Sequence, residues 1–425
     1  MTPPSSVQHP NGDSAYAVFR DRDYRFYFFG RFMASLGYLM FNMAVGWELY
    51  ERTRRPMALA FVGLTLVLPM ALFTLPAGHV ADNHDRKRVI LLASLVVGGA
   101  SLVLAFLSAK QFAVQWTYLC LFLVGGARTF LRAATASYLP QLVERRLLAR
   151  AVTWESGQFQ LASILGPATA GFIIQQTGHA AVVYATTAGL TFLCALLISF
   201  IRKHHVAVAR EEMTVKTLLT GFSFVFSNRI ILGILTLDML AVLLGGASAL
   251  LPVYAKEILH VGPALLGLLQ SALPMGAVCC AFVLAHQPPM QRAGRSLLWA
   301  VTGFGLATIG FGLSQWFWIS FAMLFLCGAS DNVSVVVRHT LVQLLTPDEK
   351  RGRVSAVNNL FIGTSNELGE FESGTVAEVC GPMLGRSIAA GAMVSVVAGG
   401  IGTILVVLGV AWYWPEIRKY GRLDS

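Results

Sequence analysis

Long stretches without a charged residue are the feature that most constrains this chain. Residues 89–107 and 296–330 contain no Asp, Glu, Lys or Arg. A membrane-spanning helix needs about 20 apolar residues, so the second stretch is too long for one span and is expected to fold back near Ser314. Only 13% of the 425 residues are charged and 55% are hydrophobic, whereas soluble domains have roughly 25% charged residues. The sequence therefore predicts an all-α polytopic membrane protein.

Apolar segments separated by short polar connections predict twelve transmembrane helices. We expect them at residues 24–50, 57–81, 88–109, 114–138, 150–176, 180–201, 229–258, 263–286, 293–313, 316–343, 352–380 and 386–413. The corresponding organisation is a disordered tail, an N-terminal six-helix half, a linker, a C-terminal half and a second tail, at residues 1–19, 20–201, 202–228, 229–415 and 416–425.

The positions of the basic residues predict the orientation. Of the 32 Lys and Arg residues, 23 fall on the side of the termini and the central linker, six fall on the opposite side and three fall inside spans. Cytoplasmic loops carry the excess of Lys and Arg. Both termini and the linker are therefore predicted to be cytoplasmic, and we expect no cleaved signal peptide at the N-terminus.

Several classes of function are disfavoured by the sequence. The net charge of +10 comes from small basic groups between spans, without the basic and aromatic blocks of a nucleic-acid surface. The histidines have no ligand spacing, the six cysteines form no CxxC pair, and GxxxxGK[ST] is missing. We expect no metal, no cofactor, no nucleic-acid partner and no ATP-driven step.

The two halves of the chain resemble each other weakly. Tyr50 and Gly63 correspond to Tyr254 and Gly267 at one offset, and Pro69-Met70 matches Pro274-Met275 after a slip of one residue. A parallel repeat of six spans around a central cavity is typical of the major facilitator superfamily.

The connection after the second predicted span carries a more specific motif. Residues 78–88, GHVADNHDRKR, resemble the loop signature of the major facilitator superfamily, with Asp85 in place of the usual Gly. Gly78 would permit a tight helix end, and the Asp82 carboxylate would bond to the N-terminus of a neighbouring helix. The basic triplet Arg86, Lys87 and Arg88 would anchor the loop at the inner leaflet as part of an inner gate.

The fifth predicted span contains ASILGPATAG at residues 162–171. This resembles the antiporter signature of exporters in the same superfamily, with Ala at two Gly positions. Gly166, Pro167 and Gly171 would kink the helix and thin it for close packing. Residues 19–53 and 351–374 further resemble the enterobactin-exporter-like branch of efflux proteins, which implies outward transport without identifying the substrate.

Ionisable residues inside spans are functional candidates, because a charge in lipid costs several kcal/mol unless it is paired or hydrated. Glu367 and Glu370 lie near mid-membrane on a polar and glycine-rich face of the eleventh span. Burial and a second carboxylate disfavour the charged form of such a group, as proton coupling requires. The alternative is a hydrogen-bond network that braces the helix. The other acidic candidates are Asp238, Asp331 and Glu48.

Arginines inside the predicted spans could be either functional or structural. Arg128 and Arg132 share one face of the fourth span. Arg128 is a candidate for holding an anionic substrate or acting on a carboxylate, and Arg132 for bracing the inner gate with Asp82. Both could instead be structural. For Asp331, the alternative to a functional role is a helix-bracing pair with Arg338, which lies seven residues later on the same face of the helix.

These observations lead to one main expectation and two alternatives. The chain is predicted to be a secondary exporter of a siderophore or drug-like small molecule, exchanging it for protons, as a monomer in a bacterial inner membrane. An importer or symporter of a metabolite or metal ion on the same fold is the first alternative. A non-transporting receptor or an integral membrane enzyme is the second, although no catalytic motif is present.

Overall fold

The computed structural model describes residues 16–202, 222–288, 290, 292–383 and 387–421. Most of the predicted tails and linker, residues 1–15, 203–221 and 422–425, lie outside this part of the chain. Within the tail predicted for residues 1–19, Ala17–Arg20 form the 3-10 helix η1 with Ala17 and Val18 buried. Within the C-terminal tail, Pro415–Lys419 form the short helix α15. Both differences arise because apolar side chains in these segments, such as Val18 and Ile417, find buried positions against the helices.

The N-terminal half contains six long helices. They are α1 Arg22–Thr53, α2 Pro56–Asn83, α3 Arg86–Ala109, α4 Gln115–Leu142, α5 Leu148–Thr177 and α6 Ala180–Ser199, with the 3-10 turn η2 Arg145–Leu147 before α5.

The C-terminal half begins with a broken span. It consists of α8 Arg229–Leu244, η3 Ala247–Leu250, α9 Leu251–Val253 and the π-helix η4 Tyr254–Ile258. The continuous helices that follow are α10 Pro263–Ala285, α11 Ala293–Leu313, α12 Phe317–Leu345, α13 Asp348–Met383 and α14 Ile388–Tyr413. Together with the N-terminal half this gives the twelve predicted spans, with ends within a few residues of those expected.

The composition of the helices fits a bilayer. Among the described residues, nine helical segments are long and apolar enough to cross a membrane, and the remaining long helices, α1, α5 and α13, carry more polar residues. Large apolar side chains such as Leu92 and Phe106 are exposed on the outside of the bundle. Trp316 and Trp318 lie at one end of α12, and Trp412 at the opposite end of α14, as expected for aromatic side chains at membrane interfaces.

The two halves pack in the same way. In the first, α3 contacts α6 and α4, α1 contacts α6 and α5, and α2 contacts α4. In the second, α11 contacts α14 and α12, α8 contacts α14 and α13, and α10 contacts α12. The two sets of contacts are equivalent when α1 to α6 are matched, in order, with α8, α10, α11, α12, α13 and α14. The predicted architecture of two pseudo-symmetric six-helix halves is therefore confirmed.

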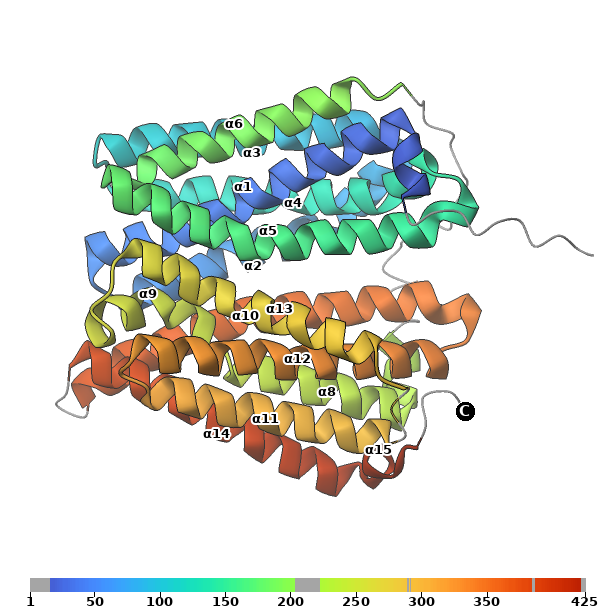
Figure 1. Ribbon diagram of the computed structural model, residues 1–425, viewed down its shortest axis with the longest axis vertical. Helices are drawn as coiled ribbons and strands as arrows, with labels where there is room; N and C mark the ends of the chain where they lie inside the picture. The colour runs from blue at the N-terminus through green and yellow to red at the C-terminus, as the bar shows by residue number, and fades with distance from the viewer. Residues whose placement is uncertain (1–15, 203–221, 289, 291, 384–386, 422–425) are drawn as a thin grey trace, which may run out of the picture.

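The halves meet through two equivalent helix pairs, α5 with α10 and α2 with α13. Figure 1 shows them closest at one end of the bundle, and diverging toward the end where α1 begins and the chain terminates. We call this end the terminal face. The opposite end, which carries the turns after α1, α3, α5, η4, α11 and α13, is called the distal face.

Two glycines at matching positions permit this close approach. A Cβ at Gly63 of α2 would lie 2.7 Å from the carbonyl oxygen of Glu367 in α13. A Cβ at Gly267 of α10 would overlap the carbonyl oxygen of Pro167 in α5. The two residues are the pair aligned by the internal repeat, so the repeat places small residues where the two halves cross.

Candidate functional site

A cavity of about 370 Å³ lies between the two halves. Its polar lining comes from both. Tyr38, Asn42 and Ser163 belong to the N-terminal half. The C-terminal half contributes Ser248, Gln270, Glu367 and Glu370. A cavity at the interface of two structural repeats is where transporters of this architecture hold their substrates.

Glu367 and Glu370 are the acidic residues of the cavity wall. The Oε2 atom of Glu367 is buried and has no hydrogen-bond partner in the described part of the chain. A buried carboxylate oxygen without a partner is costly in free energy when the carboxylate is charged. This cost must be offset by a bound proton, a ligand or a nearby cation. The structure thus brings together the two carboxylates predicted as the main candidates.

The polar face predicted for this helix points at α2. Gly363 lies against the Met70 side chain, Gly374 lies against Ala60, and the Glu378 carboxylate bonds to the start of α2. Glu372 lies off this face. It accepts a hydrogen bond from the hydroxyl of the adjacent Ser373 at 3.3 Å and does not line the cavity.

Arg128 of α4 is half-buried, and its guanidinium lies over the ring of Tyr38 in α1. A cation over an aromatic ring is stabilised by the ring quadrupole, more strongly where water is excluded. Because Tyr38 lines the cavity, Arg128 adds positive charge to the wall opposite Glu367.

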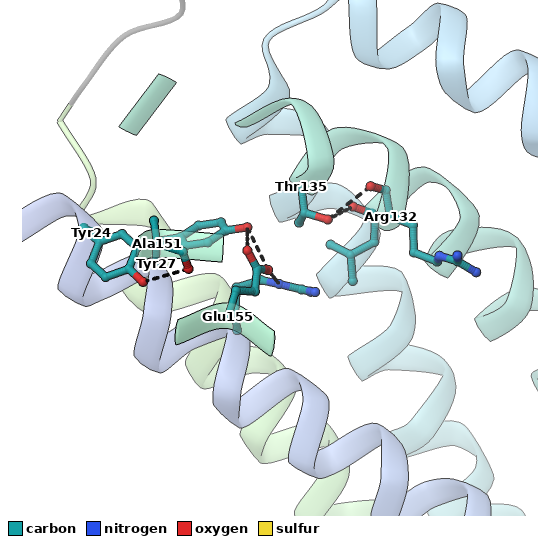
Figure 2. Close-up of polar contacts among 8 residues, drawn as sticks. Tyr24, Tyr27, Arg132, Thr135, Ala151 and Glu155 are labelled. Atoms are coloured by element: carbon teal, nitrogen blue, oxygen red, sulfur yellow. Dashed lines mark hydrogen bonds and ion pairs between the residues drawn. The ribbon is translucent and has the colours of Figure 1, made fainter. Parts of the chain in front are cut away.

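Figure 2 shows a second polar group of the N-terminal half, built on α1 and α5. The Glu155 carboxylate accepts from the Tyr27 hydroxyl at 3.2 Å and pairs with Arg31 Nε at 3.4 Å. The Tyr24 hydroxyl donates to the carbonyl of Ala151 at 3.3 Å, one turn before Glu155. Glu155 is not among the acidic candidates selected from the sequence. The signal that could have found it is the Arg31 of the first span, which also needs a partner.

Asp238 of α8 and Arg338 of α12 form a buried ion pair. Arg338 therefore does not brace Asp331 along α12, which was the structural alternative for Asp331. The reason is that α8 crosses α12 at this level, and Asp238 presents its carboxylate there. Asp331 is half-buried and forms no ion pair among the described residues. Neither aspartate lines the cavity.

Glu48 belongs to a local network near the distal end of α1. Its Oε1 atom accepts from the Ser108 hydroxyl at 2.7 Å and from Arg52 at 3.4 Å. It does not line the cavity. These partners lie in α1 and α3, within one half of the molecule.

The loop motif folds differently from the expectation at two positions. Helix α2 continues through Gly78 to Asn83, and an added Cβ at Gly78 would meet nothing within 4 Å, so no tight helix end requires this glycine. Asp82 makes no hydrogen bond or ion pair with the described residues. Instead Asp85 caps α3 by accepting from the backbone N–H of Lys87 at 3.0 Å. The departure from the family signature thus supplies the helix cap.

The basic triplet of the motif ties this loop to its own half. Arg86 is buried and donates to the carbonyls of Ala81 and Ser137, both at 3.1 Å. Lys87 donates to the carbonyls of Ser199 and Ile201 at 2.8 and 2.7 Å. A cation is stabilised beside these carbonyls at the end of α6, because the C-terminus of a helix carries partial negative charge. Arg88 pairs with Asp85 at 3.6 Å.

Arg132 does not pair with Asp82 as expected. Its side chain is exposed and points away from Glu155 in Figure 2, with no ion pair among the described residues. Its carbonyl oxygen accepts from Thr135 at 3.2 Å.

The residues of the antiporter-like motif lie where the halves cross. A Cβ at Gly171 would overlap the backbone of Pro263, and one at Gly166 would lie 2.7 Å from the Leu39 side chain. Pro167 lies against Gly267 and also lines the cavity. The hydroxyl of Ser271 in α10 donates to the carbonyl of Ile164 at 2.6 Å. Close packing of α5 against α1 and α10 therefore depends on small residues of this motif.

The described residues contain no group of three His, Cys, Asp or Glu side chains that could hold a metal ion. The sequence does not predict the ion pairs that join the halves at the distal face, Arg54–Glu257, Arg55–Glu378 and Lys256–Glu51. In the sequence, these three basic residues are only exceptions to the charge bias between the two sides of the membrane.

Comparison with known proteins identifies the family to which the chain belongs. Residues 13–409 match the family described as transmembrane secretion effector. The enterobactin exporter EntS of Citrobacter koseri is 26% identical over 404 residues, covering 93% of each chain. The protein of the same name from Escherichia coli O157:H7 is 25% identical with the same coverage.

Solved structures show the same fold at low identity. A bacterial homologue of the human lysosomal transporter Spinster, in an inward-facing and unoccupied conformation, superposes with a TM-score of 0.74 at 12% identity, covering 95% of this chain and 99% of that one. The POT family transporter PepTSo gives 0.71 at 14% identity, with 93% and 98% covered. The chain is thus a multi-pass membrane transporter and not an enzyme, and it belongs to the transmembrane secretion effector family of the major facilitator superfamily.

Proposed function

We propose that this secondary transporter is an exporter of a siderophore or drug-like small molecule, driven by proton exchange, with Glu367 as the proton-carrying group. The observation that carries the proposal is the position of Glu367. It lines the cavity between the halves, and its Oε2 atom is buried without a hydrogen-bond partner in the described chain.

Proton exchange follows from the chemistry of the cavity wall. Glu367 is close to Glu370, and two carboxylates in a partly dry cavity resist being ionised together. A proton taken up from one side is released when hydration or a cation stabilises the charged form. Arg128, over Tyr38 on the opposite wall, is such a cation. An anionic substrate held by Arg128 would compete for the charge that favours ionised Glu367, which would link substrate and proton.

Direction and substrate class rest on the relatives. The curated relatives are named as enterobactin exporters, and the antiporter-like residues 162–171 lie at the crossing of the two halves. Both favour export over the import alternative. The chemical class that the cavity suits is a small molecule with anionic groups, which a siderophore and many drug-like acids share.

We further propose that the terminal face is cytoplasmic and that the membrane is a bacterial inner membrane. The excess of Lys and Arg lies on this face. Of the basic residues predicted outside, Arg52, Arg54, Arg55 and Lys256 are each paired with a carboxylate. This pairing does not change the count, because the bias depends on the Lys and Arg residues rather than on net charge.

Flux in vesicles tests this function. The purified protein is reconstituted, a siderophore or an anionic drug is loaded, and efflux is followed with and without an imposed pH gradient. We expect a gradient that is acidic on the receiving side to accelerate efflux severalfold. Transport in the opposite direction under the same gradient would favour the symporter alternative. An efflux rate that does not change with the pH gradient would contradict proton coupling.

A further inference from the structure

Helix α2 begins without a cap from its own sequence. The chain enters it through Arg54-Arg55-Pro56, and the N-cap residue Arg55 makes no side-chain cap hydrogen bond. The first backbone N–H groups of a helix have no partner within the helix, and Ser, Thr, Asp or Asn normally supplies one. None of these residues is at this position, so the start of α2 needs a partner from elsewhere.

Glu378 of α13 supplies that partner from the other half of the molecule. Its Oε2 atom accepts from the backbone N–H of Met57 at 3.2 Å, and its Oε1 atom accepts from Arg55 Nε at 2.9 Å. A carboxylate at a helix N-terminus is stabilised by the partial positive charge there. One side chain thus satisfies the helix start and pairs with the cation beside it.

A second polar cluster lies next to this contact on the distal face. The Tyr50 hydroxyl at the end of α1 donates to Glu257 Oε1 at 3.0 Å, and Arg54 pairs with the same atom at 3.1 Å. Glu51 pairs with Lys256. Glu257 and Lys256 belong to the π-helix η4, so this cluster also joins the two halves.

We propose that Glu378 is a gating residue, which holds the distal face closed by capping α2 from the opposite half. The cap can exist only while α13 lies against the start of α2, so it stabilises this conformation over one in which the distal face is open. The pairs Glu51–Lys256 and Arg54–Glu257, which join the end of α1 to η4, act in the same direction.

The strength of these contacts suits a gate that must open. Exposed ion pairs contribute about 0.2–1 kcal/mol each, and Arg54 and Arg55 are more than half exposed. Glu378 is less exposed, at 21%, and bonds to two groups at once. It is therefore the member whose loss should shift the equilibrium most.

Labelling of one cavity residue from both faces tests the proposal. Ser248 lines the cavity and is exposed there, so Ser248→Cys is introduced in a chain whose native cysteines are replaced. A membrane-impermeant thiol reagent is applied to vesicles of each orientation. Glu378→Ala should raise the rate of labelling from the distal side by about fivefold to tenfold, the equivalent of one lost cap and ion pair. Labelling from the terminal side should fall.

Three variants sharpen the result. Glu378→Gln keeps an oxygen for Met57 N–H but loses the pair with Arg55, so its effect should be intermediate. Arg55→Ala keeps the cap and should have a smaller effect than Glu378→Ala. Glu416→Ala is the matched control, because its pair with Arg229 at 3.6 Å lies within one half, and it should label like the parent.

Unchanged labelling in Glu378→Ala, or a change equal to that of Glu416→Ala, would overturn the proposal. Faster labelling from both faces would also contradict it, because general loosening is not a shift between two conformations. The assay needs neither substrate nor a proton gradient. Its failure would therefore leave proton-coupled export untouched, and a failure of proton coupling would leave the gate untouched.

Discussion

Arg128 shows how a single charge can remain inside a membrane protein. It has no ion pair among the described residues, and its guanidinium lies over Tyr38, which lines the cavity. The ring offsets part of the cost of burial, and the remaining positive charge is available to a ligand. Arg132, one turn away, is exposed to solvent instead. The two arginines should therefore respond differently to substitution.

We predict that Arg128→Ala weakens the binding of an anionic substrate about tenfold or more, the usual effect of removing a hydrogen bond to a charged group. Arg132→Ala should leave affinity within about twofold, because its side chain is exposed to solvent, whereas Arg128 lies over the cavity-lining Tyr38. Equilibrium binding to the purified variants, with export measured alongside, checks this. Equal, small losses in both variants would indicate purely structural roles.

The Asp238–Arg338 pair is a different case, because both side chains are buried and paired with each other. Removing one partner of a buried pair leaves the other charge without compensation, which costs about 3–5 kcal/mol. Asp238→Asn should therefore lower the thermal unfolding midpoint strongly, while Asp238→Leu combined with Arg338→Met should recover much of the loss. A single variant as stable as the parent would show that the pair does not brace α8 against α12.

The sequence indicates which residues are unusual better than it indicates their partners. Helical periodicity relates Asp331 to Arg338 because they share a face of one helix, but the partner of Arg338 comes from α8. The same limit applies to Arg132 and Asp82, whose side chains do not pair although α2 and α4 pack against each other. The helix cap formed by Asp85 and the interhelical contacts of Glu155 could not be predicted, because both depend on where neighbouring backbones lie.

At the scale of helices, prediction is more successful. A span is long and uniformly apolar, so its existence follows from transfer free energy alone. The broken seventh span was predicted as one helix over residues 229–258, whereas α8 ends at Leu244 and η3, α9 and η4 follow. Gly245 and Gly246 separate these pieces, and the backbone of Gly369 in α13 lies so close to Gly246 that a side chain there would not fit.

The crossing glycines give a prediction at this scale. Gly63→Leu and Gly267→Leu each place a side chain where backbone of the opposite half now lies. Either should push the halves apart at the distal face and reduce transport at least tenfold, because helices in membranes associate through such close contacts. Gly409→Leu is the control, since an added Cβ there meets nothing within 4 Å. Transport and distal-side labelling of Ser248→Cys report the effect. Normal values in both glycine variants would contradict the importance of these crossings.

At the scale of the whole molecule, the repeat accounts for both the shape and the position of the site. Equivalent helices pack equivalently in each half, and the pairs α5–α10 and α2–α13 join the halves around one cavity. In Figure 1 the halves diverge toward the terminal face, and the capped start of α2 closes the distal face. The sequence predicted two halves from a weak repeat. It could not predict the conformation, because that depends on small energy differences between contacts at the two faces.

We propose that the acidic residues of α13 couple the movement of substrate to that of protons. An ionised carboxylate at the centre of a span costs about 2.5–3.5 kcal/mol, and Glu367 and Glu370 meet this condition together in one cavity. A Gln substitution preserves shape and hydrogen bonding but removes titration. Glu372, on the same helix and outside the cavity lining, provides the matched control.

Substrate-driven proton movement in reconstituted vesicles measures this coupling. We expect Glu367→Gln to bind substrate but to move no protons in response to it, and Glu372→Gln to behave like the parent. Full proton coupling in both Glu367→Gln and Glu370→Gln would rule out this role for the two cavity carboxylates, and Asp331 and Asp238 would then be the next residues to test.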